Sequence, residues 1–459
     1  MQNSAMRCVV AVVLFALGCA QAIGETLSLG EALGLARKQN ADIIIAQKQL
    51  EAARGGVVEA RSAYLPSVVS TGLLRKRTQQ EETRLRSDDY NASLRVVQNL
   101  YSAGANKARV AIARMIEEKR ALELAAVEQR VAMDLRVAYY ELLLNREKID
   151  VRQQSLQVMR DELRAQEERF AAGTVGELNV RRAEVSLANE QPELFDAQTR
   201  LENSYLRVNE LCGVTGTDAK PFATSGRLQY RARRLDLNQS LTSAVELRPE
   251  VRARQLDVAI EEQQLVIDRS ELRPRVEAFA GYEVYSERDP LVGDEFNHGY
   301  VVGLNASWHI FDGWATRGRM QATRARRDAA VAALEAAQRS VESDVRSAFF
   351  DLQQAERVLE SESRNVQNAT ESLELARANF GAGLGTQLDV LQATADVTRT
   401  RTTRLSAIYL HNVALARLAR ATAREPEELG LAATPVTSEN AKRQAQAFDV
   451  ARPPAQLAE

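Results

Sequence analysis

The chain has 459 residues, of which 45% are apolar and 27% charged, and its formal net charge is −2. The near-balance of 60 basic and 62 acidic residues gives no electrostatic case for nucleic-acid binding. No apolar run beyond the N-terminus is long enough for a transmembrane helix, and three cysteines with three histidines exclude a disulfide framework. Composition alone therefore indicates a soluble, mostly helical protein of two or three domains.

The N-terminus predicts a secretory signal peptide. An apolar run ends at Cys19, and the small-x-small sequence Ala20-Gln21-Ala22 follows it, so residues 1–22 are expected to be removed. Leu17-Gly18-Cys19 offers an alternative, which is lipidation at Cys19. The leucine that such a signal carries three residues before the cysteine is absent, so cleavage after Ala22 is favoured.

An internal duplication organises the rest of the chain. Phe170-Ala171-Ala172-Gly173 returns 210 residues later as Phe380-Gly381-Ala382-Gly383. Earlier in each half the spacing is 208 residues, as between Pro66 and Pro274. Two extra residues therefore enter the second half between Pro274 and Phe311, where an exposed loop is expected.

Long helices are predicted in both halves. The stretches 67–191 and 291–425 contain no proline, which is strongly unfavourable inside a helix. Residues 331–380 carry an apolar heptad with many alanines, and the first half repeats it, which is typical of a supercoiled helix. Helices over about 105–171 and 315–381 would each be roughly 100 Å long. Taken alone, the heptads favour a coiled-coil rod without a channel.

Each long helix is predicted to end at a glycine turn. Gly173 and Gly383 can adopt the left-handed conformation that closes a helix. New helical patterns then run to about Leu211 and Ala421, so each half contains a long helical hairpin. Pro192 falls inside the first return helix, and we expect it to kink or divide that helix.

Patterns of period two predict strands before each long helix. Apolar and polar side chains alternate over 91–101 and more regularly over 300–310, with partners predicted at 67–77 and 275–286. One interpretation is two hairpins packed on a soluble core. The strand length, however, matches that of a tilted strand crossing a bilayer.

The membrane interpretation of these strands requires several chains. Tyr300 and Trp308 lie near opposite ends of the predicted strand, as interfacial aromatic residues do. Four strands cannot close a barrel, because the smallest barrels have eight, and an open edge is not tolerated in lipid. Three chains that pool their strands would supply twelve.

On these residues the chain resembles the TolC-like outer membrane efflux proteins along almost its whole mature length. The most specific marks are Phe170-x-x-Gly173 followed by Leu178-Asn179-Val180, the second copy ending in Leu388-Asp389-Val390, and Leu211-Cys212-Gly213. The resemblance implies a mostly helical fold with membrane strands. It also implies a homotrimer in the cell outer membrane, in which twelve strands form a β-barrel and the helical hairpins form a tunnel through the periplasm.

The resemblance implies a division of the chain after the signal peptide. The expected parts are a first repeat at 23–212, an equatorial linker at 213–236, a second repeat at 237–423 and a C-terminal equatorial segment with a flexible tail at 424–459.

The resemblance also implies two groups of functional residues. The glycine turns are expected to be periplasmic tips where a membrane-fusion adaptor docks, through Phe170, Ala172, Gly173, Thr174, Phe380, Ala382, Gly383 and Leu384. Family members narrow the tip entrance with acidic side chains; here Asp389 holds the first such position, Gln392 replaces the second acid, and Asn179 stands in the first repeat. Three Asp389 carboxylates around an axis would attract cations. Alternatively, Asp389 only caps a helix start.

The favoured function is a passive exit duct of a tripartite efflux or type I secretion system, driven by an inner-membrane pump of RND, ABC or MFS type. The alternatives are a periplasmic adaptor, which would carry one hairpin, and a structural coiled-coil protein, which would need no bilayer-length strands. No enzyme, cofactor or metal site is expected, because His298, His309 and His411 lack spaced metal-binding or nucleophilic partners.

Overall fold

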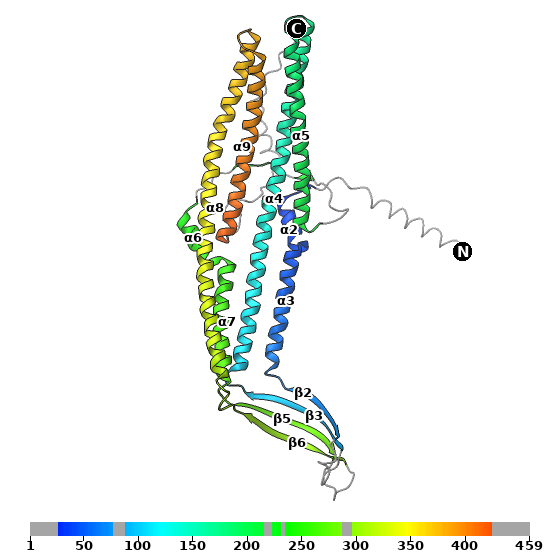
Figure 1. Ribbon diagram of the computed structural model, residues 1–459, viewed down its shortest axis with the longest axis vertical. Helices are drawn as coiled ribbons and strands as arrows, with labels where there is room; N and C mark the ends of the chain where they lie inside the picture. The colour runs from blue at the N-terminus through cyan, green and yellow to red at the C-terminus, as the bar shows by residue number, and fades with distance from the viewer. Residues whose placement is uncertain are drawn as a thin grey trace, which may run out of the picture. The chain divides into compact units, whose positions relative to one another are not determined.

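The computed structural model describes residues 26–76, 88–214, 223–224, 226–230, 235–286 and 296–424 (Figure 1). Several sequence predictions lie outside these described residues: the signal peptide with Cys19, much of the linker 213–236, part of the segment between Pro274 and Phe311 where an exposed loop is expected, and the tail from residue 425.

The helices follow the duplication. The first repeat contains α2 (Leu29–Gln39), α3 (Ala41–Ser62), α4 (Ala105–Ala171) and α5 (Glu177–Cys212); the second contains α6 (Leu237–Leu247), α7 (Pro249–Ser270), α8 (Ala315–Gly381) and α9 (Gln387–Thr422). Corresponding ends are 208 residues apart up to α7 and 210 apart from α8 onward. The predicted long helices are confirmed, since α4 and α8 each have 67 residues, about 100 Å.

The first return helix is not divided by its proline. α5 runs unbroken for 36 residues with Pro192 inside it, so of the two expected outcomes, a kink or a division, the division does not occur. Side-chain contacts tie α5 to α4 on both sides of the proline: Arg152 pairs with Glu190 at 3.1 Å, and the Asn145 amide donates to the Ser204 hydroxyl at 2.7 Å. These contacts offset the one backbone hydrogen bond that a proline removes.

The chain divides into two units, which are described separately. The sheet unit holds Ile45–Val127 and Val245–Val341. The tip unit holds the described residues up to Ile44, Glu128–Ala244 and those from Glu342 onward. In neither unit, within the described residues, is any helix long and apolar enough to cross a membrane.

The sheet unit contains four antiparallel strands. They are β2 (Ser67–Lys76), β3 (Asp88–Tyr101), β5 (Arg275–Ser286) and β6 (Phe296–Ser307), in the order β2-β3-β5-β6 (Figure 1). Both predicted hairpins are confirmed, but the last strand is shifted from the expected 300–310. Trp308 has left the ladder, and its indole Nε1 donates to the carbonyl of Leu272 at 3.1 Å.

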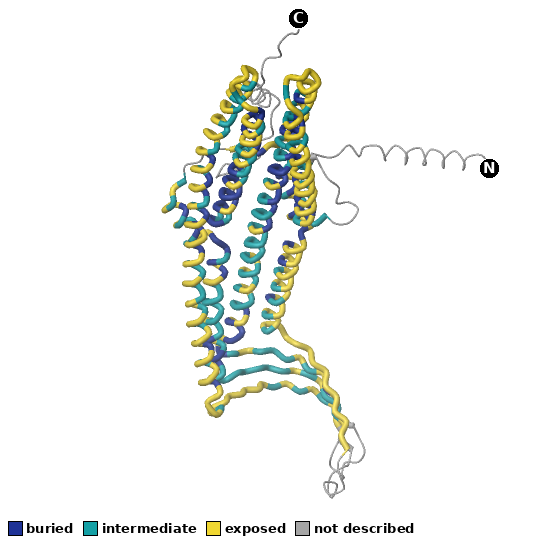
Figure 2. The backbone as a smooth tube through the Cα atoms, turned by 45° about the horizontal axis from the view of Figure 1, so that its top comes forward, coloured by how far each residue is buried: buried dark blue, intermediate teal, exposed yellow. Residues whose placement is uncertain are grey.

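The register gives the sheet one apolar and one polar face. Leu94 lies opposite Tyr282, which lies opposite Tyr300, and all three belong to the apolar face. On the other face Arg95 forms an ion pair with Glu283. β2, one of the two outermost strands, is exposed along its whole length (Figure 2).

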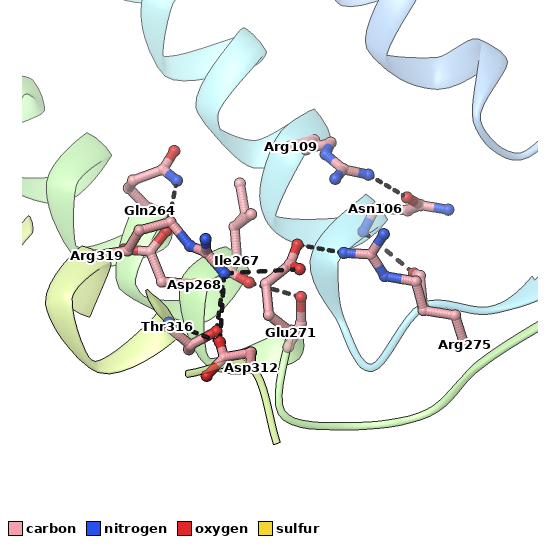
Figure 3. A network of polar contacts seen from close by, with 12 residues as sticks. Asn106, Arg109, Gln264, Ile267, Asp268, Glu271, Arg275, Asp312, Thr316 and Arg319 are labelled. Atoms are coloured by element: carbon pink, nitrogen blue, oxygen red, sulfur yellow. Dashed lines mark hydrogen bonds and ion pairs between the residues drawn. The ribbon is translucent and has the colours of Figure 1, made fainter. Parts of the chain in front are cut away.

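A polar network fixes the start of α8 against α7 and β5 (Figure 3). The Asp312 carboxylate accepts the backbone N–H of Thr316 at 2.7 Å, and these Thr316 hydrogen bonds lower the pKa of Asp312. The Arg319 guanidinium lies 3.9 Å from Asp312 and 3.9 Å from Glu271. Glu271 also pairs with Arg275, the first residue of β5, so sheet and helix start share one network.

The tip unit has its core where the long helices meet the start of α2 and the segment 226–230. The buried cluster contains Leu29, Tyr139, Leu143, Leu144, Leu228, Leu359, Ala407 and Ile408. A short parallel pair, β1 (Thr26–Leu27) with β4 (Ala223–Thr224), lies in this unit, and the Tyr139 hydroxyl donates to the carbonyl of Leu27 at 3.0 Å. Heptad positions such as Leu142 and Leu352 are buried in both repeats.

The Leu211-Cys212-Gly213 motif closes the first repeat. Gly213 has a φ of +75°, and a Cβ there would lie 2.4 Å from the carbonyl oxygen of Gln39. The Asn40 amide donates to the carbonyl of Leu211 at 2.9 Å. Burial raises the pKa of the Cys212 thiol to about 11, so this cysteine is a packing residue.

Candidate functional site

The first hairpin tip is a glycine turn between α4 and α5. Gly173 adopts a φ of +73° and donates its N–H to the carbonyl of Phe170 at 2.9 Å. The N–H of Thr174 reaches the carbonyl of Arg169 at 2.9 Å, which completes a Schellman-type helix end. Ala172, Gly173 and Thr174 are exposed, and Phe170 is 47% exposed. The structure therefore brings the four predicted residues of this tip together on an open surface.

The second tip repeats this backbone between α8 and α9. Gly383 also has a φ of +73°, its N–H reaches Phe380 at 3.1 Å, and the N–H of Leu384 reaches Asn379 at 2.8 Å. Leu384 is 83% exposed, and Ala382 and Gly383 are exposed. The predicted residues of this tip are therefore also gathered at one turn.

The start of α9 has a capping box that α5 lacks. Asp389 Oδ2 accepts the Thr386 hydroxyl at 2.7 Å and the Thr386 N–H at 2.8 Å, and the Thr386 hydroxyl receives the N–H of Asp389. The hydrogen bonds from Thr386 lower the pKa of Asp389. In the first repeat Gly176 caps α5 without a side-chain bond, and Asn179 stands in place of Asp389.

Two of the three predicted constriction residues, Asp389 and Gln392, share one side of α9, whereas Asn179 lies on α5. Asp389 and Gln392 are both exposed and lie three residues apart, so they project from the same side of the helix. Asp396, one heptad after Asp389, is exposed on that side too. The sequence prediction missed Asp396, although the seven-residue spacing was available to find it.

The two tips touch through an arginine that the sequence did not reveal. The Arg169 guanidinium lies over the Phe380 ring at 4.7 Å from its centroid, and further down the Thr398 hydroxyl donates to Ser155 at 3.1 Å. A recess of about 460 Å³ opens beside this contact; its lining includes Met159, Glu162, Arg169, Arg377, Phe380 and Leu391. Both turns lie at the same end of the tip unit (Figure 1).

The histidines do not form a metal centre in the part of the chain that the structure describes. No group of three or more His, Cys, Asp or Glu is close enough there to hold a metal ion. His298 accepts or donates a hydrogen bond with the Tyr282 hydroxyl at 2.7 Å. His411 is fully buried against the edge of Tyr230, with centroids 4.7 Å apart, and burial lowers its pKa.

The fold defines a class of protein. Each repeat contributes one long helical hairpin and two strands of a four-stranded sheet with one apolar face. This is the subunit architecture of a membrane channel extended by a helical tunnel. The model of the outer membrane efflux protein family matches residues 32–214 and 240–424, and the chain belongs to this family. The family and its solved members are channels, not enzymes.

Solved and curated relatives agree with this assignment. The chain superposes on the outer-membrane channel OprN with a TM-score of 0.74, covering 87% of this chain and 90% of OprN at 21% identity. It is 25% identical over 187 residues to the cobalt-zinc-cadmium resistance protein CzcC of Cupriavidus metallidurans, 41% of this chain and 42% of CzcC. It is 25% identical over 301 residues to protein CyaE of Bordetella pertussis, 65% of this chain and 63% of CyaE. Both curated matches span less than two thirds of the relative's length.

Proposed function

We propose that this chain is the outer membrane channel-tunnel of a tripartite efflux or type I secretion system, acting as a passive exit duct. The single observation that carries the proposal is a bilayer-length sheet with one apolar face, joined within one chain to two helices of about 100 Å. The function of a periplasmic adaptor does not require such a sheet. A coiled-coil rod does not require the polar face of this sheet.

The sheet supports a homotrimer. Within the described residues β2 and β6 are the outermost strands of the sheet and each has one unpaired edge. Unpaired edges are not tolerated in lipid, and four strands cannot close a barrel. Pairing of β6 in one chain with β2 of the next closes twelve strands with three chains and leaves no edge.

The apolar face supports contact with outer membrane lipid. Tyr300, Val302 and Leu304 are 90%, 81% and 70% exposed, which is costly in water and favourable in a bilayer. Tyr300 also contacts Tyr282 of the neighbouring strand, with ring centroids 5.2 Å apart. Trp308, just beyond the end of β6, adds a further aromatic residue on the other side of Val302 and Leu304.

Two measurements test this function with the full chain. Native mass spectrometry of the detergent-solubilised protein should give a trimer, and planar bilayers should show discrete conductance steps. Membrane fractionation should recover the protein with the outer membrane. Recovery only in the soluble periplasmic fraction, or a monomer without conductance, would reject the channel.

The hairpin tips are proposed to bind a periplasmic adaptor, which links the duct to an inner-membrane pump of RND, ABC or MFS type. Exposed apolar side chains at the turns, above all Leu384 and Phe170, support this role. Leu384→Asp should reduce adaptor crosslinking in cells at least about ten-fold, since interface anchors dominate binding. The control Leu375→Asp changes an exposed leucine inside α8, 65% exposed and nine residues before Leu384. Equal crosslinking by both variants would reject tip docking.

Asp389 is proposed to form a ring of three carboxylates that narrows the entrance, with Gln392 and Asn179 as its uncharged neighbours. The exposure of Asp389 beside the turn supports the ring, because a charged side chain open to solvent there can attract cations. Asp389→Asn should lower the cation preference of single channels. Thr386→Ala should retain that preference, because it removes the cap and leaves the charge. Equal loss in both variants would assign Asp389 a capping role only.

The predicted division of the chain remains part of the proposal. Residues 1–22 are proposed to be a signal peptide, and 213–236 and 424–459 to be equatorial segments beside repeats 23–212 and 237–423. The family match at 32–214 and 240–424 is compatible with this division. The mass of the protein purified from membranes distinguishes cleavage after Ala22 from lipidation at Cys19.

A further inference from the structure

Both tryptophans of the chain lie in one short segment between β6 and α8. This junction has seven residues, 308–314, whereas its counterpart between β3 and α4 has three, 102–104. The two residues that distinguish the repeats are inserted after the start of β6, because β3 and β6 begin 208 residues apart but α4 and α8 begin 210 apart. The longer junction therefore belongs to the second repeat alone.

The junction presents large apolar side chains to its surroundings. The exposed fractions are 58% for Trp308, 81% for Ile310, 72% for Phe311 and 65% for Trp314. These side chains have defined neighbours: the Trp308 indole donates to Leu272, and Phe311 meets Trp314 edge to face with centroids 5.9 Å apart. Aromatic residues held in this way at the end of a membrane strand are typical of a bilayer interface.

Two exposed arginines lie near the start of α8, and one of them contacts these aromatic residues. The Arg317 guanidinium lies over the Trp314 ring, 5.4 Å from its centroid. Arg324 is one heptad further along the same side of α8. Among the described residues neither has an ion-pair partner, whereas nearby Arg319, Arg326 and Arg327 contact carboxylates at 3.9, 3.2 and 2.7 Å.

We propose that Trp308, Phe311, Trp314, Arg317 and Arg324, called here the junction patch, bind the headgroup of an anionic phospholipid at the periplasmic surface of the outer membrane. The proposal rests on the membrane placement of the sheet in the proposed function. Charge complementarity identifies the ligand: a zwitterionic lipid offers no net charge to two unpaired guanidinium groups, whereas an anionic headgroup does. The planar guanidinium of arginine can also donate two parallel hydrogen bonds to the phosphate oxygens of such a headgroup.

The first repeat retains the cations and one aromatic residue, Tyr101 in place of Phe311, but neither tryptophan. Lys107 and Arg114 stand 210 residues before Arg317 and Arg324, and both are exposed. Gly104, however, occupies the place of Trp314. A basic strip is thus common to both repeats, and the tryptophan-lined patch occurs once in each chain.

Intrinsic fluorescence reports on this patch specifically, because the chain has no tryptophan elsewhere. The full-length Trp308→Phe variant, with Trp314 as its only tryptophan, is reconstituted into vesicles that contain brominated phosphatidylglycerol or, at equal mole fraction, brominated phosphatidylethanolamine. We expect the anionic lipid to associate at least about five-fold better, judged by quenching, since one basic side chain near a charged surface contributes about that factor. Higher ionic strength should reduce the preference.

Matched variants separate the patch from total charge. Arg317→Gln with Arg324→Gln, in the Trp308→Phe background, should bring quenching by the two lipids to parity. The control pair Arg160→Gln and Arg164→Gln removes the same charge from exposed positions near the far end of α4 and should retain the preference. Equal quenching by both lipids before any arginine is changed would overturn the proposal, and so would parity in the control pair.

The same vesicles distinguish failure of the inference from failure of the proposed function. Channels that conduct without quenching by either lipid would reject the patch and leave the exit duct standing. Selective quenching without conductance would reject the duct and retain the lipid site.

Discussion

The two hairpin tips have the same backbone and different side-chain chemistry. Gly173 and Gly383 share a φ of +73°, and the helices on each side have equal lengths. In the first tip Phe170 is 47% exposed, whereas in the second Phe380 lies under Arg169. The second tip also has the Thr386–Asp389 capping box.

This difference shows that the duplication constrains the backbone of the two tips and leaves their side chains free to differ. Helix length and the glycine turn must be equal in both repeats for the hairpins to end together. Capping, charge and ring contacts act locally, so they have diverged. The second repeat has the better-defined helix start, and the first has the more open apolar tip.

The largest expected effect tests whether the two long helices are equivalent. Leu142 and Leu352 are both buried heptad residues, and proline at either position should cost about 3 kcal/mol or more and prevent trimer assembly. Blue native electrophoresis of Leu142→Pro and Leu352→Pro measures this loss. The control Leu352→Met changes the side chain and leaves the backbone intact. An assembled, conducting Leu352→Pro trimer would show that the helix is not required at that point.

The next-largest expected effect is on stability and concerns the C-terminal ends of the return helices α5 and α9. Gly213 and its counterpart Ala423 both adopt left-handed conformations, with φ of +75° and +51°. Gly213→Ala should reduce the free energy of unfolding by roughly 2–4 kcal/mol for two reasons. The new Cβ would clash with the Gln39 carbonyl, and alanine is strained at this positive φ. Ala423→Gly should stabilise the protein by up to about 1 kcal/mol. Denaturant unfolding followed by circular dichroism compares them, and equal small effects would contradict the close packing at Gly213.

A smaller effect tests the contact between the tips. Asn379 is the counterpart of Arg169, so Arg169→Asn makes the first tip resemble the second at this position. Loss of the cation–π contact should cost about 0.5–1 kcal/mol, as expected for a contact near the surface. A double-mutant cycle with Phe380→Leu isolates the pair. A coupling energy indistinguishable from zero would mean that the tips are not joined there.

The smallest effect at neutral pH concerns the buried His411, whose counterpart in the first repeat is Leu201. Burial lowers the pKa of His411, so below about pH 6.5 the unfolded chain binds more protons than the folded chain. The stability conferred by the neutral ring is therefore complete above that pH and is lost as the pH falls towards the lowered pKa. The Glu356 carboxylate, 3.9 Å from Nε2, opposes this loss only in part. Thermal unfolding between pH 7 and 5 should show a decline that His411→Leu removes.

The sequence predicted the helices better than it predicted their contacts. Heptads and glycines placed the ends of α4, α5, α8 and α9 within a residue or two, because these signals are local and occur twice. The last strand was misplaced, since alternation continues through Trp308 and Ile310 although the ladder ends at Ser307. Alternation reports which side chains are apolar, and it does not report where a strand loses its partner.

The contacts at the candidate site required the folded chain. Arg169 over Phe380 joins residues that are 211 positions apart and share no motif. Asp389 was assigned from the resemblance, and only the structure revealed that Thr386 holds its carboxylate. The capping pattern Thr-x-x-Asp was nevertheless present in the sequence and could have been used.

Because the helices of the two repeats have equal lengths, helix length sets the width of periplasm that the chain can bridge. Insertion of one heptad into a single long helix would advance that helix by about 10.5 Å and leave its hairpin unmatched. A longer tunnel therefore requires the same insertion in four helices, α4, α5, α8 and α9. Variants of this architecture that bridge a wider or narrower periplasm should differ by whole heptads. Each heptad should be added or removed in all four helices together.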